Sequence, residues 1–442
     1  MKTIRSELLL AGMTCLLLVM TVLTGNETTA QQKNPEPIKI PEGFYPLLPW
    51  DFIVPGDSLT YIADCNFTMA GFVRPYDIKR VEKLGLKAII NIYFSVGGKY
   101  QPEWEWRNLS DEEIVRKVKM MIDSTGNSDA VIGYYLMDEP SALSFPALGK
   151  AVAAVKKYAP GKLAYINLFP SDEYKGNGTL ETDPRYSQCG TNTYAEYLER
   201  FVNEVKPQFI SYDNYMVQNS LDFKDKTNVR YYTNLLEIRR IALKYELPYW
   251  NIVPSRQVYP ANTIPSFPSL LFHAYTSLAA GYDGISWWKY KGRITNYSPI
   301  DNEQNKSVTW YYLKEVNRQI LTLGPLMNQL TSTGVFFTSL VSDVTFPGLP
   351  GKIVESLKSD EPMMVGEFIS GTGTRYVMIV NLSLERSVKF TFSTKTATEK
   401  ISIISATYDH SLKPRIIAMD MDGHKNGLWL TAGEGVLIKV GD

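Results

Sequence analysis

The pattern of apolar and polar positions changes character near residue 331. Before that point, a short apolar run, a polar loop and an amphipathic segment recur in turn from about residue 43. Short apolar runs of this kind predict strands buried on both faces. The predicted strands are Phe44 to Trp50, Phe67 to Val73, Leu86 to Phe94, Val131 to Met137, Leu163 to Leu168, Phe209 to Tyr212, Tyr249 to Val253 and Gly284 to Trp288.

The segments between these strands have helical periodicity. After the third and fourth strands, apolar residues recur three and four positions apart, at Ile114, Val118 and Met121, then at Phe145, Leu148, Val152 and Val155. Eight alternating units predict an α/β fold, a closed (β/α)8 TIM barrel over residues 43–330. A doubly wound open sheet is the alternative, but no Gly-x-Gly-x-x-Gly loop follows the first strand.

After residue 331 the chain has the pattern of an all-β domain. Short β-type runs are separated by Gly, Asp, Asn and Lys turns, at Arg375 to Leu382, Ser387 to Phe392, Ile401 to Ala406, Ile416 to Met419, Leu428 to Leu430 and Val436 to Val440. This pattern predicts a small β-sandwich over residues 331–442. We expect it to pack on the barrel, with sugar binding as a second possible role.

The first thirty residues have the pattern of a targeting segment. Basic residues precede an apolar run from Leu8 to Leu23, and small residues end at Ala30. The segment resembles a secretory signal peptide (1–30), and a polar, proline-containing linker follows it (31–42). We therefore expect a secreted protein, periplasmic or at the cell surface, with no further apolar segment long enough to span a membrane.

Composition narrows the classes of partner. The 46 basic and 46 acidic side chains cancel, which argues against a nucleic-acid partner because that would need a basic field. The histidines, His273, His410 and His424, suggest neither a metal site nor a Ser-His-Asp triad, so we expect no metal or cofactor. The mature chain has Cys65 and Cys189, which form either one disulfide or two buried thiols.

The fourth predicted strand ends in two carboxylates and a proline, Asp138, Glu139 and Pro140. Pro140 stops the strand because it lacks an N–H group and restricts the residue before it. Glu139 therefore lies at the carboxyl end of a barrel strand, where active sites of such barrels are built. The alternative is a helix N-cap by Asp138, but a cap needs one acid and leaves the second unexplained.

Other polar and aromatic residues are expected at the same end of the barrel. Strand by strand they are Asp51, Arg74, Ser95, Asp138, Glu139, Asn167, Asp213, Asn214, Tyr215, Ser255, Arg256, Gln257, Trp287, Trp288 and Lys289. Hydrolysis of a glycosidic bond needs one carboxylic acid and a second carboxylate, and we expect Glu139 to be the acid. The residues expected to bind the sugar are Asp51, Asp138, Asn167, Tyr215, Gln257, Trp287 and Trp288. The 28 tyrosines and 8 tryptophans either serve such binding or pack helices on the barrel.

Asp213 is the best candidate for the second carboxylate, because it ends another strand. Its alternative role is that of a turn or cap aspartate. Neighbouring side chains on a strand point to opposite faces, so Asp138 is not expected to flank the same bond as Glu139. Glu103 and Glu105, in a tryptophan-containing loop, are second choices. Asp283 begins the eighth strand and falls at the wrong end of the barrel.

The barrel resembles the glycoside hydrolases of clan GH-A, in particular family 42 β-galactosidases and their relatives. The resemblance is carried by Gly133 to Pro140, Tyr165 to Leu168, Ser211 to Tyr215 and Gly284 to Trp288. It implies that Glu139 is the clan's acid/base glutamate at the end of strand 4. The preceding residue, usually Asn in the clan and in contact with the sugar, is Asp138 here. The clan's nucleophilic glutamate ends strand 7, but Trp250 to Gln257 contains no acid.

Three functional hypotheses follow. The first is a secreted hydrolase of an oligo- or polysaccharide that uses Glu139 and Asp213, retaining if the carboxyls lie about 5 Å apart and inverting at about 6.5 to 9.5 Å. The second is a carbohydrate-binding barrel without hydrolysis, suggested by the missing glutamate of strand 7. The third is a lyase or epimerase with Arg256 or Lys289 as base or charge stabiliser.

Overall fold

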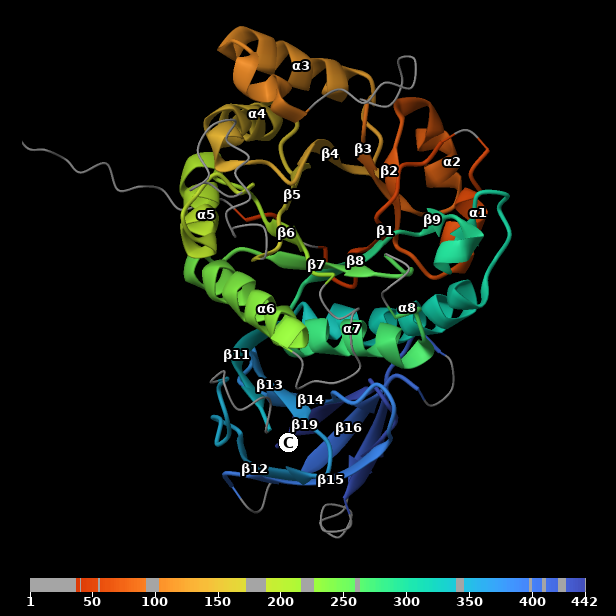
Figure 1. Cartoon of the computed structure of the whole chain (residues 1–442), viewed down its shortest axis with the longest axis vertical. Coiled ribbons are helices and arrows are strands. Elements are labelled where there is room, and N and C mark those ends of the chain that lie inside the picture. The colour runs from red at the N-terminus through yellow and green to blue at the C-terminus, as the bar shows by residue number, and fades with distance from the viewer. Residues whose placement is uncertain are drawn as a thin grey trace, which may run out of the picture. The chain divides into compact units, whose positions relative to one another are not determined.

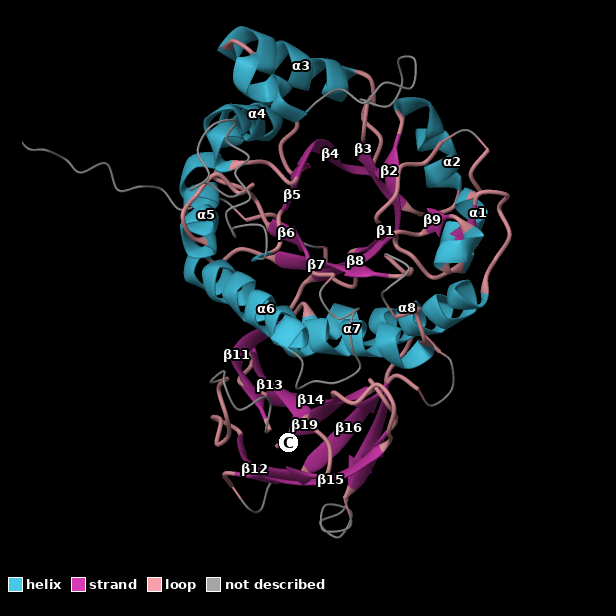
Figure 2. Cartoon of the chain, in the orientation of Figure 1, coloured by secondary structure: helices cyan, strands magenta, loops and turns pink. Residues whose placement is uncertain are grey.

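The first part of the computed structural model is a ring of eight parallel strands, shown in Figures 1 and 2 with helices around it. The structure describes residues 37–39, 41–54, 56–92, 103–171, 188–215, 226–258, 263–338, 346–396, 400–407, 411–419 and 427–441. The barrel strands are β1 (Leu47–Pro49), β2 (Met69–Val73), β3 (Lys87–Ile90), β4 (Val131–Asp138), β5 (Leu163–Leu168), β6 (Ile210–Asp213), β7 (Tyr249–Pro254) and β8 (Gly284–Trp288).

The strands pair in the order β1-β8-β7-β6-β5-β4-β3-β2, and the ring closes between β1 and β2. There the Ile53 N–H donates to the Phe72 carbonyl (2.9 Å), and the Phe72 N–H donates to the Asp51 carbonyl (3.0 Å). Gly71 has φ +86°, and a Cβ there would lie 2.7 Å from the Pro49 carbonyl oxygen. The absence of a side chain at Gly71 therefore allows the two strands to meet. The predicted closed barrel is confirmed.

Helices cover the outside of the ring. Their bounds are α1 (Leu59–Asp64), α2 (Ile78–Lys83), α3 (Asp111–Asp123), α4 (Phe145–Tyr158), α5 (Tyr194–Arg200), α6 (Lys226–Tyr245), α7 (Phe267–Ala279) and α8 (Val308–Met327). Short helical turns are η1 (Pro75–Asp77), η2 (Glu103–Asn108), η3 (Ala142–Ser144), η5 (Phe201–Val205) and η6 (Ile294–Asn296). All the apolar positions that the sequence assigned to the inner faces of α3 and α4 are buried.

Aromatic side chains fill the inside of the barrel. Trp50, directly after β1, contacts Phe72 on β2 (ring centroids 4.5 Å apart) and Tyr165 on β5 (5.6 Å). Tyr165 in turn contacts Trp250 on β7 (6.0 Å). Because β1 and β5 lie on opposite sides of the ring, these contacts cross its interior. Many of the aromatic residues therefore pack the barrel rather than face a ligand.

Two short strands follow β8 at the mouth of the barrel. They are β9 (Lys291–Gly292) and β10 (Ile300–Asp301), which pair in parallel with η6 between them. The backbone of this segment is tied to the end of β7, since the Gln257 N–H donates to the Asn296 carbonyl (2.8 Å). The segment thus forms one wall of the barrel mouth.

The C-terminal part contains a six-stranded and a three-stranded antiparallel sheet. Their strands are β11 (Leu330–Phe337), β12 (Val354–Ser359), β13 (Met363–Ser370), β14 (Arg375–Asn381), β15 (Val388–Thr394), β16 (Ile401–Ser405), β17 (Arg415–Met419), β18 (Leu428–Leu430) and β19 (Gly435–Val440). Apolar side chains of both sheets, such as Val365, Ile379, Phe390 and Leu430, form one core between them. The predicted sandwich is confirmed, although β11, β12 and β13 are absent from the strands predicted.

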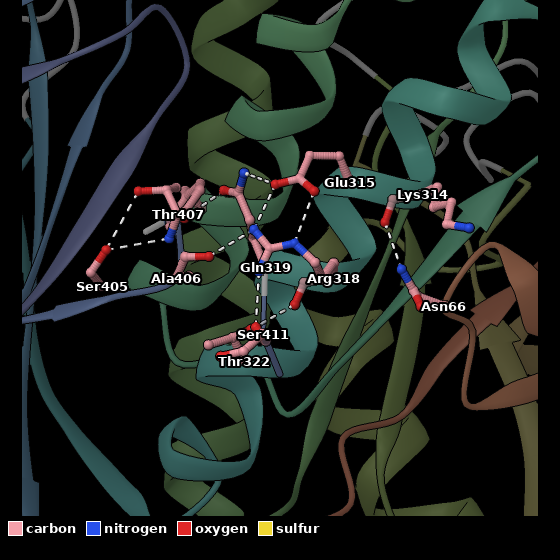
Figure 3. Close-up of polar contacts among 11 residues, drawn as sticks. Asn66, Lys314, Glu315, Arg318, Gln319, Thr322, Ser405, Ala406, Thr407 and Ser411 are labelled. Carbon is pink, nitrogen blue, oxygen red and sulfur yellow. Dashed lines mark hydrogen bonds and ion pairs between the residues drawn. The ribbon is translucent and has the colours of Figure 1, made fainter. Parts of the chain in front are cut away.

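The sandwich packs on helix α7 of the barrel and is hydrogen-bonded to α8. Arg318 of α8 donates to the carbonyls of Ala406 (2.8 Å) and Ser411 (3.0 Å), and it is paired on its own helix with Glu315 (2.6 Å). Figure 3 shows these contacts together with Gln319 and Thr322 of the same helix. A buried guanidinium whose donors are used in this way ties the two layers together.

Gly366 of β13 provides a test of this packing. A Cβ at Gly366 would fall against the carbonyl oxygen of Ala279, the last residue of α7. We expect Gly366→Ala to lower the free energy of unfolding by about 1–3 kcal/mol, because backbone would have to move apart. The measurement is denaturant unfolding, with Gly371→Ala as the control since nothing lies within 4 Å of a Cβ there. Equal stability of both variants would contradict this close packing.

Candidate active site

Glu139 follows β4 directly and leaves the strand in an unusual conformation. Its N–H donates to the Asn167 carbonyl (2.9 Å), so pairing with β5 continues to this residue. Its φ is +45°, in the left-handed region that residues other than glycine rarely adopt. Such a conformation costs free energy and is found preferentially at functional sites. The Glu139 side chain is half-buried.

The carboxyls of Asp138, Glu139 and Asp213 belong to one hydrogen-bonded group. Asn167 of β5 donates through Nδ2 to Asp138 (2.9 Å) and to Asp213 (2.9 Å). Asp213 is in turn hydrogen-bonded to Glu139. The Asn167 Oδ1 accepts from Ser211 (3.0 Å), which fixes the orientation of the amide. The structure therefore brings Glu139 and Asp213, the two carboxylates expected to do the chemistry, into direct contact.

Contrary to the expectation from strand alternation, Asp138 and Glu139 belong to the same group of carboxyls. Alternation along a strand would send these two side chains to opposite faces. The positive φ of Glu139 breaks that alternation, so its carboxyl reaches Asp213 while Asp138 reaches the same group through Asn167. Asp138 thus lies beside the carboxyl pair.

Burial and shared hydrogen bonds determine the charge of this group. Burial raises the pKa of Asp213 above its ordinary value, and hydrogen bonds with Glu139, Asn167 and Tyr215 offset part of the rise. Two carboxyls can form a hydrogen bond only if one of them carries a proton. Burial, followed by the charge of Asp213, raises the pKa of Tyr215, which keeps its hydroxyl a donor. The raised pKa of Asp213 favours retention of one proton by the Glu139–Asp213 pair.

Aromatic and basic side chains border the pair. Tyr215 stacks on Trp288 with ring centroids 4.9 Å apart and an interplanar angle of 29°. The Arg256 guanidinium lies over the Trp288 ring, 4.3 Å from its centroid. Arg256 follows buried Ser255 at the end of β7, where no acid occurs. A stacked aromatic pair and a cation thus form one side of the mouth.

The structure does not bring Trp287 to the mouth. Its side chain is fully buried, and its Nε1 donates to the Asn317 side chain of α8 (2.8 Å), so it lies between β8 and that helix. Gln257 is half-buried and held to the β9–β10 segment through its backbone. Asp283 lies at the amino end of β8, where it accepts from the Tyr249 N–H (3.0 Å).

Asp51 lies in a cavity at the carboxyl ends of β1, β7 and β8. The cavity has a volume of about 680 Å³ and is lined by Asp51, Phe52, Val54, Arg256, Lys289, Lys291, Gly292, Arg293, Asn296 and Asn302. Asp51 accepts from the Lys291 N–H (2.8 Å) and lies 3.8 Å from the Lys289 ammonium. Lys291 and Arg293 were not among the residues predicted to lie at the barrel mouth. Together with Lys289 they form a run of basic residues after strand 8, and this run could have indicated them.

The remaining sequence candidates lie elsewhere. The loop with Glu103 and Glu105 becomes η2, which buried Trp106 pins to β4 by donating to the Leu136 carbonyl (3.0 Å). The side chains of Glu103 and Glu105 lie outside the described residues, as do Ser95, His410 and His424. His273 is packed in α7, where burial lowers its pKa to about 3.

Both cysteines of the described chain, Cys65 and Cys189, are buried free thiols. In the part of the chain that the structure describes, no three His, Cys, Asp or Glu side chains are arranged to hold a metal ion. No helix among the described residues combines the length and the apolar character needed to cross a bilayer.

Comparison with known proteins gives matches in structure alone. No protein-family model and no curated protein matches the sequence. A catalytic mutant of a GH42 β-galactosidase from G. stearothermophilus matches 92% of this chain and 100% of its own, with 6% identity and a TM-score of 0.54. The β-galactosidase of the psychrophilic Marinomonas ef1 matches 64% of this chain with 10% identity and a TM-score of 0.45, and the matched part spans 60% of that enzyme. The endo-β-1,4-glucanase Xac0029 from Xanthomonas axonopodis pv. citri matches 65% of this chain and all of its own, with 12% identity and a TM-score of 0.40.

At such low sequence identity, a structural match shows the fold alone. The roles of individual residues must be argued from the geometry of the site. The match to the GH42 enzyme extends over both the barrel and the C-terminal sheets. The chain therefore has a TIM barrel followed by a β-sandwich, the fold that it shares with that enzyme.

Proposed function

We propose that this protein is a secreted glycoside hydrolase that cleaves O-glycosidic bonds of an oligo- or polysaccharide. Glu139 is the general acid, and Asp213 is the second carboxylate. The observation that carries the proposal is the hydrogen-bonded pair of carboxyls from β4 and β6 at the carboxyl end of the barrel. Fold neighbours that are glycosidases support the same class.

The charge of the pair suits this chemistry. Glycoside hydrolysis starts with one protonated carboxyl, which protonates the leaving oxygen, and one ionised carboxyl, which acts as nucleophile or base. One shared proton supplies both species. Asp213, more deeply buried than Glu139, is held by Asn167 and Tyr215. Direct contact of the carboxyls is nearer to the short separation of retaining enzymes than to the longer gap that an inverting enzyme keeps for water.

The acid of strand 7 expected from the clan has no counterpart here, so the second carboxylate comes from strand 6. Arg256 occupies the end of β7 and stacks on Trp288. In that arrangement Arg256 is a ligand-facing cation rather than a nucleophile. The Tyr215–Trp288 stack offers an aromatic surface beside the pair, which suits the apolar face of a sugar ring.

The test is the rate of nitrophenol release from a panel of 4-nitrophenyl α- and β-glycosides. NMR of the reaction mixture then identifies which anomer of the sugar is released first. Release of nitrophenol with retained configuration is the expected outcome. If the wild-type protein is inert on the whole panel yet binds oligosaccharides, the protein is instead a carbohydrate-binding barrel. An unsaturated product absorbing in the near ultraviolet would identify a lyase.

The pH profile gives a separate prediction. Asp213 must be ionised to act, and its pKa is raised by burial, so kcat/KM falls on the acid side at a pH above the ordinary aspartate value of 3.8. Below that limb both carboxyls are protonated, and no ionised group remains to attack. Activity should be followed together with circular dichroism, which separates titration from acid unfolding. Full activity down to pH 3.8 would contradict the role of Asp213.

A further inference from the structure

The cavity beside the carboxyl pair has a strongly basic lining. Four of its lining side chains are cationic, and Asp51 is the one acid among those that line it in the described structure. The whole chain has equal numbers of acidic and basic residues, so this excess is local. The cationic side chains are Arg256, Lys289, Lys291 and Arg293.

Two acids of the described chain lie beside these cations. Lys291 forms an ion pair with Asp57, which also accepts from the Gln304 side chain (3.1 Å). Lys289 lies 3.8 Å from Asp51, and its side chain is 40% exposed. Among the described residues that line the cavity or pair with its lining, four cations face two acids, Asp51 and Asp57. An open, concave surface with such an excess attracts anions.

Contacts connect the cavity to the carboxyl pair. Arg256 lines the cavity and lies over Trp288, which stacks on Tyr215. Tyr215 is in turn hydrogen-bonded to Asp213. A sugar placed over the Tyr215–Trp288 surface would therefore have a substituent within the reach of the basic lining. A planar guanidinium held by stacking is well suited to bind a carboxylate or a sulfate through two hydrogen bonds.

We propose that this cavity binds an anionic substituent of the saccharide, the carboxylate of a uronic acid or a sulfate ester, and that the substrate is an acidic glycan. This inference rests on the proposed function for its placement beside a cleavage site. It identifies the substrate class through Arg256 and Arg293, with Lys289 as a third cation.

Asp51 adds a pH dependence to anion binding. Burial raises the pKa of Asp51 to about 6, and the charge of Asp57 adds to the rise. The ammonium of Lys289 and the N–H groups of Lys291 and Phe52 lower the pKa and offset part of this rise. Protonation of Asp51 as the pH falls below 6 removes the negative charge beside Lys289. Uronates and sulfates stay ionised at pH 5, so their binding should be tighter at pH 5 than at pH 7.5.

The experiment is retention of the full-length Glu139→Gln protein on an array of uronate-containing, sulfated and neutral oligosaccharides. Every retained glycan is expected to carry a carboxylate or a sulfate, and binding should weaken as salt increases. Carboxyl-reduced and desulfated forms of a retained glycan distinguish the two anions. Arg256→Gln and Arg293→Gln should each weaken binding about tenfold or more. Arg116→Gln, on an exposed face of α3, is the control and should bind like the parent.

The inference would be overturned if neutral glycans were retained as strongly as acidic ones, or if no glycan were retained. Thermal unfolding of each variant shows whether it is folded, and Arg293 is exposed enough to be replaced without loss of packing. If the wild-type protein cleaves neutral glycosides without preference for acidic ones, the proposed hydrolase stands and the acidic substrate is wrong. If it binds acidic glycans and cleaves none of them, the basic cavity binds an acidic glycan as proposed and the proposed hydrolase is wrong.

Discussion

Glu139→Gln should lower kcat on a glycoside with a poor leaving group by about 10²- to 10⁴-fold, while the protein stays folded. Glutamine has the size of glutamate but has no acidic proton to give to the leaving oxygen. On a 2,4-dinitrophenyl glycoside, whose leaving group needs no protonation, the loss of kcat/KM should be much smaller, because kcat/KM reports the step in which the leaving group departs. The dependence on leaving group therefore identifies Glu139 as the acid.

Asp213→Asn should behave differently, because it removes the second carboxylate. Loss of turnover is then expected with good and poor leaving groups alike. Glu112→Gln on the exposed side of α3 is the matched control and should retain wild-type kcat. A Glu139→Gln enzyme with undiminished turnover of the poor substrate would rule out the proposed assignment.

Glu367→Ala should cost about 3–5 kcal/mol of unfolding free energy. Glu367 lies in the middle of β13 and is fully buried. Its carboxylate accepts from the N–H groups of Lys352 (2.7 Å), Ile353 (2.9 Å) and Val354 (2.8 Å). Alanine leaves these three donors without their acceptor and opens a cavity in the sandwich.

The measurement is urea unfolding monitored by tryptophan fluorescence. Glu355→Ala, at an exposed position of the adjacent strand β12, is the matched control and should change stability by less than about 0.5 kcal/mol. Glu367→Gln should fall between the two, because an amide oxygen can still accept part of these hydrogen bonds. A Glu367→Ala protein as stable as the control would show that the three N–H groups find other partners.

The sequence was sufficient to predict the barrel, because its strands are continuous apolar runs ended by polar residues. β5 and β8 were predicted with the observed bounds, and β4 to within one residue. The placement of Glu139 and Asp213 at one end of the barrel follows from the same pattern, since parallel strands present their carboxyl ends together.

The strands that escaped prediction contain residues that interrupt the local pattern. In β13 a buried glutamate, Glu367, occupies the centre of an apolar run, and its carboxylate accepts from backbone N–H groups at the start of β12 and just before it. In β12 several positions are exposed and polar, so the run carries little apolar signal. Both strands therefore depend on partners outside their own segment, Glu367 on the N–H groups beside it and β12 on its pairing with β15.

The fold class and the candidate acid could be predicted from the sequence, because both depend on the order of apolar and polar residues along single segments. The other features depend on contacts between segments that are far apart in the chain. Adjacent Trp287 and Trp288 separate into a packing residue and a mouth residue, and the left-handed backbone of Glu139 turns its carboxyl to Asp213. The basic cavity likewise exists only where β9 folds back beside Arg256 and Asp51. Distances between side chains from different strands are set by closure of the barrel, and no local pattern contains them.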